Sequence, residues 1–163
     1  MVTVITPPQI LKNPNIYNDS KSLFLAGSIE MGICEDWQQK TIDIIKNDSK
    51  MSNDVIIFNP RRPDWDSKWE QNCENPHFSQ QVNWELDHLE KADIIFMNFE
   101  EETKSPITLL ELGLYIKSNI VVCCPNKFWR QGNVDIVCHR NNIPLFDNFD
   151  LAVEYVSHLL FKS

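Results

Sequence analysis

Two acidic residues lie in segments of the chain that are otherwise apolar. Glu111 is an acid among apolar neighbours near the start of an expected helix, and buried glutamates are rare unless paired or functional. The helix start favours the ionised carboxylate that a nucleophile needs. Glu85 adjoins the apolar stripe of the preceding helix. Two carboxyl groups beside one substrate suit cleavage of a glycosidic bond, in which one attacks the sugar and the other handles a proton.

These acids also have a plainer interpretation. For Glu111 the alternative is a partly exposed side chain on an ordinary helix, and both interpretations stay open at this point. Asp87 and Glu90, in the same acidic cluster as Glu85, are expected to face water. Gly113, in the helix of Glu111, costs about 1 kcal/mol relative to alanine, which suggests close approach by a ligand or another backbone.

The segment Gly27–Gly32 is a further candidate, because two of the chain's four glycines lie there, directly after an apolar run. Glycine lets a backbone approach a ligand closely. The segment has neither the Gly-x-Gly-x-x-Gly pattern of a dinucleotide-binding turn nor the Gly-Lys-Ser/Thr of a Walker loop. A tight turn between a strand and a helix is an equally good interpretation.

The chain has five cysteines, and their spacing matches no zinc ribbon. Cys123 and Cys124 lie in an apolar run, where cysteine behaves as a small hydrophobe. Cys138 and His139 are adjacent, so their side chains point apart on one element, which disfavours a nucleophile and base pair. We therefore expect reduced, structural thiols, and we predict no metal site and no cofactor.

Short apolar runs alternate with longer amphipathic segments, and no internal repeat is visible. The apolar runs predict strands at residues 22–26, 54–58, 93–99, 119–124 and, as a short edge strand, 143–146. The amphipathic segments predict helices at residues 35–46, 78–92, 108–117, 134–140 and 150–161. Residues 61–77, rich in proline, aspartate, asparagine and tryptophan, predict a long loop.

The expected strands are apolar throughout, which is typical of parallel strands covered by helices on both faces. Right-handed crossovers then give a Rossmann-like, doubly wound parallel sheet of about five strands in a three-layer α/β/α arrangement. The length of 163 residues fits one domain, residues 1–163. Ligands bind such sheets at the carboxyl ends of the strands, which makes four loops candidates for chemistry: 27–32, 59–66, 100–106 and 125–133.

The formal net charge of −8 argues against tight binding of a nucleic-acid polymer, because that requires clustered basic residues. No run approaches the roughly 20 apolar residues that span a bilayer. Residues 1–21 lack the pattern of a secretory signal. We therefore expect a cytoplasmic protein that binds small molecules and has no membrane partner.

Four blocks of sequence resemble the nucleoside 2-deoxyribosyltransferase superfamily, in the family's order and over most of the chain. They are residues 25–29 (Leu-Ala-Gly-Ser-Ile), 84–93 (Trp-Glu-Leu-Asp-His-Leu-Glu-Lys-Ala-Asp), 110–113 (Leu-Glu-Leu-Gly) and 128–134 (Phe-Trp-Arg-Gln-Gly-Asn-Val). The resemblance implies a flavodoxin-like sheet and a homo-oligomer whose active sites are completed by a neighbouring subunit. It also implies a small-molecule nucleoside or nucleotide and a free nucleobase as ligands.

The resemblance assigns roles to particular residues. Glu111 occupies the position of the nucleophile, which forms a covalent deoxyribosyl intermediate. Glu85 falls where the family usually has an aspartate that contacts the nucleobase or its proton, so its carboxylate is displaced by one methylene. Gly27 and Ser28 are expected near the base and the sugar. Tyr115 is expected one helical turn from Glu111, where it orients that carboxylate.

Ser105 separates two branches of the superfamily. Transferases commonly have an aspartate in this loop that binds the 5′-hydroxyl, whereas nucleotide N-hydrolases have a serine at this spacing that contacts a 5′-phosphate. The arginines at residues 61–62, or Arg130, would also suit a phosphate. The segment 128–134 looks more like a transferase-like subgroup, and its Asn133 resembles the asparagine that a partner subunit donates to the 5′-hydroxyl.

The sequence therefore predicts an enzyme that cleaves the N-glycosidic bond of a 2′-deoxynucleoside through Glu111 and transfers the sugar to another nucleobase. Glu85 is the candidate acid. Two alternatives remain, a hydrolase of 2′-deoxynucleoside 5′-monophosphates and a non-catalytic nucleotide sensor. Asp64, in the long loop, is a candidate substrate contact, although capping or solvation of the loop is the preferred interpretation.

Overall fold

The sheet is parallel, and the chain adds strands to it on both sides of a central pair. The computed structural model describes residues 1–10, 20–29, 35–50, 54–62 and 64–162. Within them, six parallel strands pair in the order β1-β3-β2-β4-β5-β6. They are β1 (Val2–Ile5), β2 (Ser20–Gly27), β3 (Asp54–Phe58), β4 (Ile94–Asn98), β5 (Ile120–Cys123) and β6 (Leu145–Phe146).

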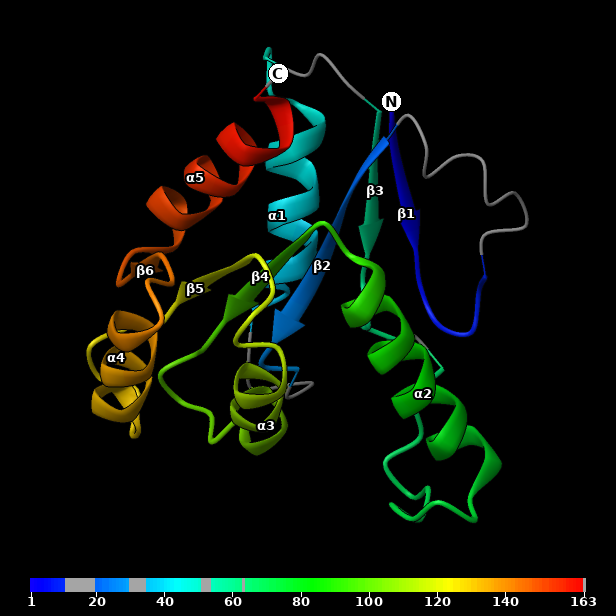
Figure 1. The fold of residues 1–163 in the computed structure, drawn as a ribbon. Coiled ribbons are helices and arrows are strands. Elements are labelled where there is room, and N and C mark those ends of the chain that lie inside the picture. Colours follow the sequence, from blue (N-terminus) through cyan, green and yellow to red (C-terminus); the bar gives the residue numbers. More distant parts are fainter. Residues whose placement is uncertain (11–19, 30–34, 51–53, 63, 163) are drawn as a thin grey trace.

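Helices cover both faces of this sheet. One face carries α2 (Pro76–Lys91), α3 (Pro106–Leu114) and α4 (Gln131–Arg140), and the other carries α1 (Trp37–Lys46) and α5 (Phe149–Phe161), as Figure 1 shows. The neighbouring strands β2 and β4 are followed by α1 and α3, which lie on opposite faces. The carboxyl ends of β2 and β4 therefore mark the switch point, where sheets of this kind bind ligands.

Side chains along a strand alternate between two separate hydrophobic cores, one on each face of the sheet. In β4, Ile95 and Met97 belong to the core beneath α2, α3 and α4, whereas Ile94 and Phe96 belong to the core beneath α1 and α5. Both sets are buried. A strand between two helical layers has no solvent-facing side, which explains why its residues are apolar at every position rather than at every second one.

The predicted fold class is confirmed, and the sequence prediction missed one strand. β1 lies at the edge of the sheet and is only partly buried, so its short run Val2–Ile5 carries a weak signal beside the prolines that follow it. Four helices also begin earlier than predicted, α5 by a single residue at Phe149. α2 begins at Pro76 because the Asn75 side chain accepts hydrogen bonds from the first turn, and α3 and α4 begin at Pro106 and Gln131.

No helix in the ranges that the structure describes is long and apolar enough to cross a membrane.

Candidate active site

Glu85 and Glu111 come from two helices that cover the same face of the sheet. α3 begins directly after the loop that follows β4, and α2 begins after the loop that follows β3 (Figure 1). Thr108, Glu111 and Leu112 are buried at helical spacing, so Glu111 lies on the inward side of α3, with 8% of its surface exposed. Glu85 is half-buried on α2.

Both carboxyl groups hold their protons more tightly than exposed glutamates do. Burial, with a further contribution from the nearby charge of Glu85, raises the pKa of Glu111 to about 8. Burial also raises the pKa of Glu85 to about 7, although a hydrogen bond from Gln81 opposes the rise. Among the described residues no cation forms an ion pair with either group. The charge of Glu85 disfavours ionisation of Glu111, so the ionisation of the two groups is linked.

The position of Glu111 corrects one expectation from the sequence. The start of a helix was expected to favour the ionised carboxylate, but the pKa of Glu111 is raised. Glu111 is the sixth residue of α3, beyond the first turn in which the helix dipole acts. Desolvation therefore dominates, and the carboxyl group of Glu111 holds its proton more tightly than that of an exposed glutamate does.

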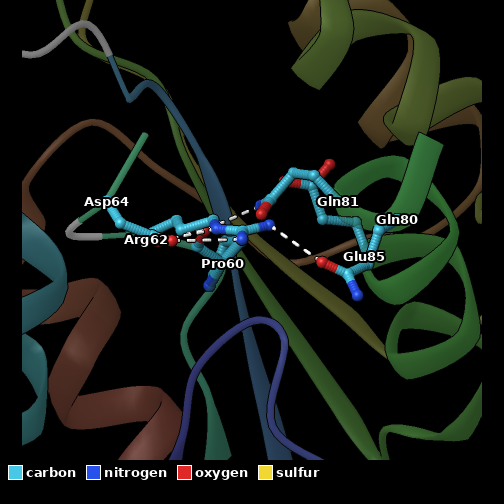
Figure 2. Close-up of polar contacts among 6 residues, drawn as sticks. All are labelled: Pro60, Arg62, Asp64, Gln80, Gln81 and Glu85. Carbon is cyan, nitrogen blue, oxygen red and sulfur yellow. Dashed lines mark hydrogen bonds and ion pairs between the residues drawn. The ribbon is translucent and has the colours of Figure 1, made fainter. Parts of the chain in front are cut away.

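Gln81 connects Glu85 to the loop that follows β3. Its Nε2 atom donates to Glu85 Oε1 at 2.7 Å and to the carbonyl oxygen of Pro60 at 2.9 Å, as drawn in Figure 2. The Gln81 side chain is itself buried. Glu85 is thus held to the carboxyl edge of the sheet as well as to its own helix.

Asp64 belongs to a polar group on the same loop. Arg62 is buried and donates to Asp64 through Nε at 2.7 Å and Nη2 at 3.2 Å (Figure 2). Its Nη1 atom donates to Gln80 Oε1 on α2 at 3.3 Å. The guanidinium holds the pKa of the exposed Asp64 below its ordinary value. The Asp64 carboxylate is therefore engaged by Arg62 within its own loop and remains accessible to solvent.

Ser28 and Ser105 meet in a buried cluster of hydroxyl groups at the switch point. Ser28 Oγ lies 2.9 Å from Thr103 Oγ1 and also contacts Ser105 Oγ, and Thr103 Oγ1 lies 2.6 Å from Ser105 Oγ. The backbone of Ser105 is left-handed, with φ of 44°. A non-glycine residue in that conformation is strained, and such strain is concentrated at functional sites.

Gly27 ends β2 in a conformation that only glycine tolerates. Its φ is 142°, and a Cβ atom there would lie 2.1 Å from the carbonyl oxygen of Asn98 at the end of β4. The next residue, Ser28, donates its backbone N–H to that same oxygen at 3.0 Å. Gly27 is thus required for the close approach of β2 and β4, which brings Ser28 into the cluster.

Within the described residues, three others from the sequence analysis form no hydrogen bond to the carboxyl group of Glu85 or Glu111. The hydroxyl of Tyr115 donates to the carbonyl oxygen of Leu86 on α2 at 3.4 Å, rather than to Glu111. Asn133 is exposed on α4. A Cβ atom on Gly113 would meet nothing within 4 Å, so the close approach that this glycine suggested is not found within the described chain.

Three of the described cysteines are buried in the cores of the fold. Cys123, Cys124 and Cys138 are free and buried, and burial raises the pKa of these thiols to about 12, 12 and 11. A raised pKa disfavours the thiolate, so these thiols suit packing rather than nucleophilic attack. Cys34 lies outside the described residues. No group of metal-ligating side chains is found within the ranges that the structure covers.

Two surface depressions lie away from the acids. One runs along α1 beside Asp36 and Lys40, and the other lies between the end of α3 and the loop before β6. Neither is lined by Glu85 or Glu111. The arrangement that can do chemistry is therefore a pair of carboxyl groups whose pKa values burial raises, with a strained serine at the start of the helix that carries Glu111.

Comparison with known proteins assigns the chain to a family. The family described as nucleoside 2-deoxyribosyltransferase-like matches residues 20–128, which is more than half of the chain. This chain belongs to the nucleoside 2-deoxyribosyltransferase-like family. No curated protein matches it. The matched region runs from β2 to the loop after β5, so that the switch point and both acid-bearing helices lie within the nucleoside 2-deoxyribosyltransferase-like part.

The family match covers almost all of the predicted site residues. Of the predicted site residues, only Asn133 lies beyond the match. Two side chains of the site were not predicted at all. Gln81 precedes Glu85 by four residues, the spacing at which helical side chains meet, so this contact was open to prediction. Thr103 lies in a polar loop with no periodicity, and only the fold brings it to Ser28.

Proposed function

We propose that this protein is a nucleoside 2-deoxyribosyltransferase that cleaves the N-glycosidic bond of a 2′-deoxynucleoside. The observation that carries the proposal is the buried pair Glu85 and Glu111, whose pKa values burial raises to about 7 and about 8 and which has no neutralising cation in the described chain. Such a pair is costly to the fold. It suits a reaction that needs a carboxylate and a carboxylic acid together at neutral pH.

In the first step the Glu111 carboxylate attacks C1′ of the deoxyribose. The C1′–N bond breaks, its electron pair goes to the departing base, and the proton of Glu85 is transferred to a nitrogen of that base. The products are a free base and an ester between C1′ and Glu111. Positive charge develops on the sugar in the transition state, next to a carboxylate, and is thereby stabilised.

In the second step an incoming base attacks C1′ through a ring nitrogen and displaces Glu111. The proton that this nitrogen loses returns to Glu85, and the pair regains its starting state. If water attacks instead, the result is hydrolysis, with the same transfer of one proton to Glu85. Neither step requires a metal ion or an organic cofactor.

The remaining predicted residues form the walls of the site in this proposal. Gly27 and Ser28 lie near the base and the sugar, at the switch point between β2 and β4. Ser105 presents the start of α3 to the 5′ end of the sugar. Asp64 closes the site from the β3 loop, and Tyr115 supports α3 against α2.

A second candidate function is hydrolysis of 2′-deoxynucleoside 5′-monophosphates, which Ser105 favours. Its hydroxyl lies at a helix N-terminus, a common binding place for a phosphate. The pairing of two arginines argues against a phosphate ligand. Arg62 is paired with Asp64, and Arg61 lies with its Nε atom 3.3 Å from Asp36, so neither is free to neutralise a phosphate. Arg130 is exposed and lies over the Trp129 ring at 4.2 Å, so of the three arginines only this one is left to meet a phosphate. The pairing of Arg61 and Arg62 favours the nucleoside as substrate.

We further propose that the enzyme is a homo-oligomer in which a partner subunit supplies Asn133. Ile107, Leu110 and Leu114 are 58–60% exposed and recur on one side of α3, so an apolar stripe lies on the helix that carries Glu111. A Leu110→Glu variant is expected to lower the molar mass measured by sedimentation. An unchanged molar mass would contradict a role for this stripe in assembly.

The proposed function is tested by base exchange. Incubation of the protein with deoxyinosine and free adenine is expected to give deoxyadenosine and hypoxanthine. Release of base from a deoxynucleoside 5′-monophosphate, without release from the nucleoside, would establish the hydrolase instead. Tight binding of nucleotide without turnover, unchanged by Glu111→Ala, would establish a non-catalytic sensor.

A further inference from the structure

The side chain of Gln81 connects the acid pair to the sheet. Gln81 lies one turn before Glu85 on α2, and only 4% of its surface is exposed. Its amide nitrogen has two hydrogens and makes two hydrogen bonds, one to Glu85 Oε1 and one to the carbonyl oxygen of Pro60 (Figure 2). Both donors of the amide are therefore used within the site.

The amide oxygen of Gln81 has no hydrogen-bond partner in the described chain, although it is buried. Rotating the amide by half a turn would place this oxygen against two other acceptors, so the nitrogen must face Pro60 and Glu85. An unpaired buried acceptor destabilises the fold, because it has lost its hydrogen bonds to water. An apolar side chain of similar size would avoid this cost, so packing does not explain why an amide is present. The two hydrogen bonds that the amide donates do explain it.

The far end of the contact is anchored. Pro60 follows Asn59, whose backbone N–H donates to Ile5 at the end of β1 at 2.9 Å. The side chain of Asn59 accepts from the backbone N–H of Arg61 at 3.0 Å. The Pro60 carbonyl is therefore fixed by neighbours on both sides, and Gln81 transmits that constraint to Glu85.

We propose that Gln81 is a positioning residue that fixes the Glu85 carboxyl group by joining its Oε1 atom to the Pro60 carbonyl oxygen. Because Oε1 accepts the amide N–H, the proton of Glu85 resides on Oε2, the oxygen left free for the substrate. The inference rests on the proposed function, in which Glu85 exchanges a proton with the base. Gln81 thereby selects the oxygen through which this exchange takes place.

The other ionisable groups around Glu85 are few. Glu111 faces it from α3, and Tyr115 lies at the end of the same helix. Arg62, on the β3 loop, is engaged by Asp64 and Gln80. On α2 itself, His88 Nδ1 is hydrogen-bonded to the carbonyl oxygen of Trp84 at 2.6 Å, and Asp87 and Glu90 are exposed. Within the described ranges, the hydrogen bonds to Glu85 come from Gln81 alone.

The test compares Gln81→Leu with Gln80→Leu, the same substitution on the neighbouring residue, which contacts Arg62 rather than Glu85. Glutamate labelled with carbon-13 at the carboxyl carbon is titrated by NMR, and Glu85→Gln assigns the signal. Loss of the N–H donor is expected to raise the pKa of Glu85 in Gln81→Leu and to leave it unchanged in Gln80→Leu. A Glu85 signal that titrates alike in both variants and the wild type would overturn the proposal.

Turnover gives a second result. In Gln81→Leu we expect kcat to fall about tenfold to a hundredfold with little change in KM, because a misplaced acid affects the chemical step. The alkaline limb of the pH profile is expected to move to higher pH with the pKa of Glu85. A fall in kcat with an unmoved limb would show a merely structural role.

A measurement on the wild-type protein covers the case in which Gln81→Leu does not fold. The side-chain amide signals of Gln81 in a proton–nitrogen spectrum are expected to shift with the Glu85 titration and to lose that shift in Glu85→Gln. Independent titrations would overturn the proposal. These spectra need no turnover, so a linked titration in a protein that exchanges no bases would contradict the proposed function while supporting the placement of Gln81.

Discussion

The two faces of the sheet differ in how their charged groups are satisfied. Beneath α1 and α5, Asp48 accepts a hydrogen bond from Ser157, which lowers its pKa, and Lys40 pairs with Asp150 at 3.0 Å. On the opposite face, Glu85 and Glu111 are more deeply buried, and burial raises the pKa of both.

This difference indicates which face is organised for stability and which for chemistry. On the α1–α5 face Ser157 donates a hydrogen bond to the Asp48 carboxylate, so ionisation of Asp48 favours folding. On the α2–α4 face ionisation opposes folding, because two carboxyl groups share a site without a cation. Groups that cost stability persist where a reaction needs them. The comparison is open to test by substituting the same chemical groups on both faces.

The largest contrast is expected in turnover. Glu111→Gln keeps the shape of the side chain but removes the charge that attacks C1′, so we expect base exchange to fall by about a thousandfold or more. Asp48→Asn makes the same change on the opposite face and is expected to leave turnover within about twofold. Rates of deoxyadenosine formation measure both. Equal losses in the two variants would remove the distinction between the faces.

The next contrast compares Gly27, at the junction of β2 and β4, with Gly132 on α4. Gly27→Ala is expected to reduce the free energy of unfolding by about 3 kcal/mol, because the new Cβ would collide with the Asn98 carbonyl oxygen in a left-handed conformation. Gly132→Ala, where a Cβ meets nothing within 4 Å, is expected to be neutral or stabilising by up to about 1 kcal/mol. Urea unfolding measures both, and a tolerated Gly27→Ala would contradict the described junction of β2 and β4.

The pH dependence of stability is expected to have opposite signs on the two faces. The folded-state pKa of Glu111 lies near 8, above its unfolded value of 4.5, so its ionisation destabilises the fold as pH rises between these values. Glu111→Gln should therefore raise the free energy of unfolding at pH 8.5, by a few kcal/mol at most, and have little effect at pH 5.

Asp48 behaves in the reverse way because its pKa is lowered on folding. Its contribution to stability is present above pH 3.8 and is lost as pH falls, so Asp48→Asn should destabilise the protein modestly at neutral pH and less in acid. Thermal unfolding across this pH range measures both variants. A Glu111→Gln variant that is less stable than the wild type at pH 8.5 would show that the carboxylate is paired in solution.

The smallest effect is expected at Tyr115. Its hydroxyl makes one long hydrogen bond to the Leu86 carbonyl oxygen, so Tyr115→Phe should cost less than about 0.5 kcal/mol and change turnover by less than about threefold. A much larger loss of turnover, with stability unchanged, would restore the orienting role that its position one turn from Glu111 predicted.

Local patterns were sufficient for most of the fold. Strands such as β4 are apolar at every position, and the fold class followed from this pattern and from the alternation of strands and helices. β1 escaped prediction because its identity depends on pairing with β3, which is distant in the sequence. Helix boundaries shifted where a cap outside the apolar pattern, such as Asn75, decided the start.

The candidate site was less open to prediction. Glu111 stood out because a charged residue interrupted an apolar helix, and Glu85 because of its resemblance to a family position. The direction of their pKa values did not follow from the sequence, since it depends on desolvation by the folded protein. The cluster of Ser28, Thr103 and Ser105 also requires the fold, because two loops far apart in the chain must meet.

The central claim is that the Glu111 carboxylate bonds to the sugar, and mass spectrometry tests it most directly. The protein is mixed with a deoxynucleoside without an acceptor base, quenched in acid and digested. The account predicts one added deoxyribosyl group on the peptide that contains Glu111, and none in the Glu111→Gln variant. Base exchange by Glu111→Gln at the wild-type rate, or a sugar bound to a different residue, would contradict it.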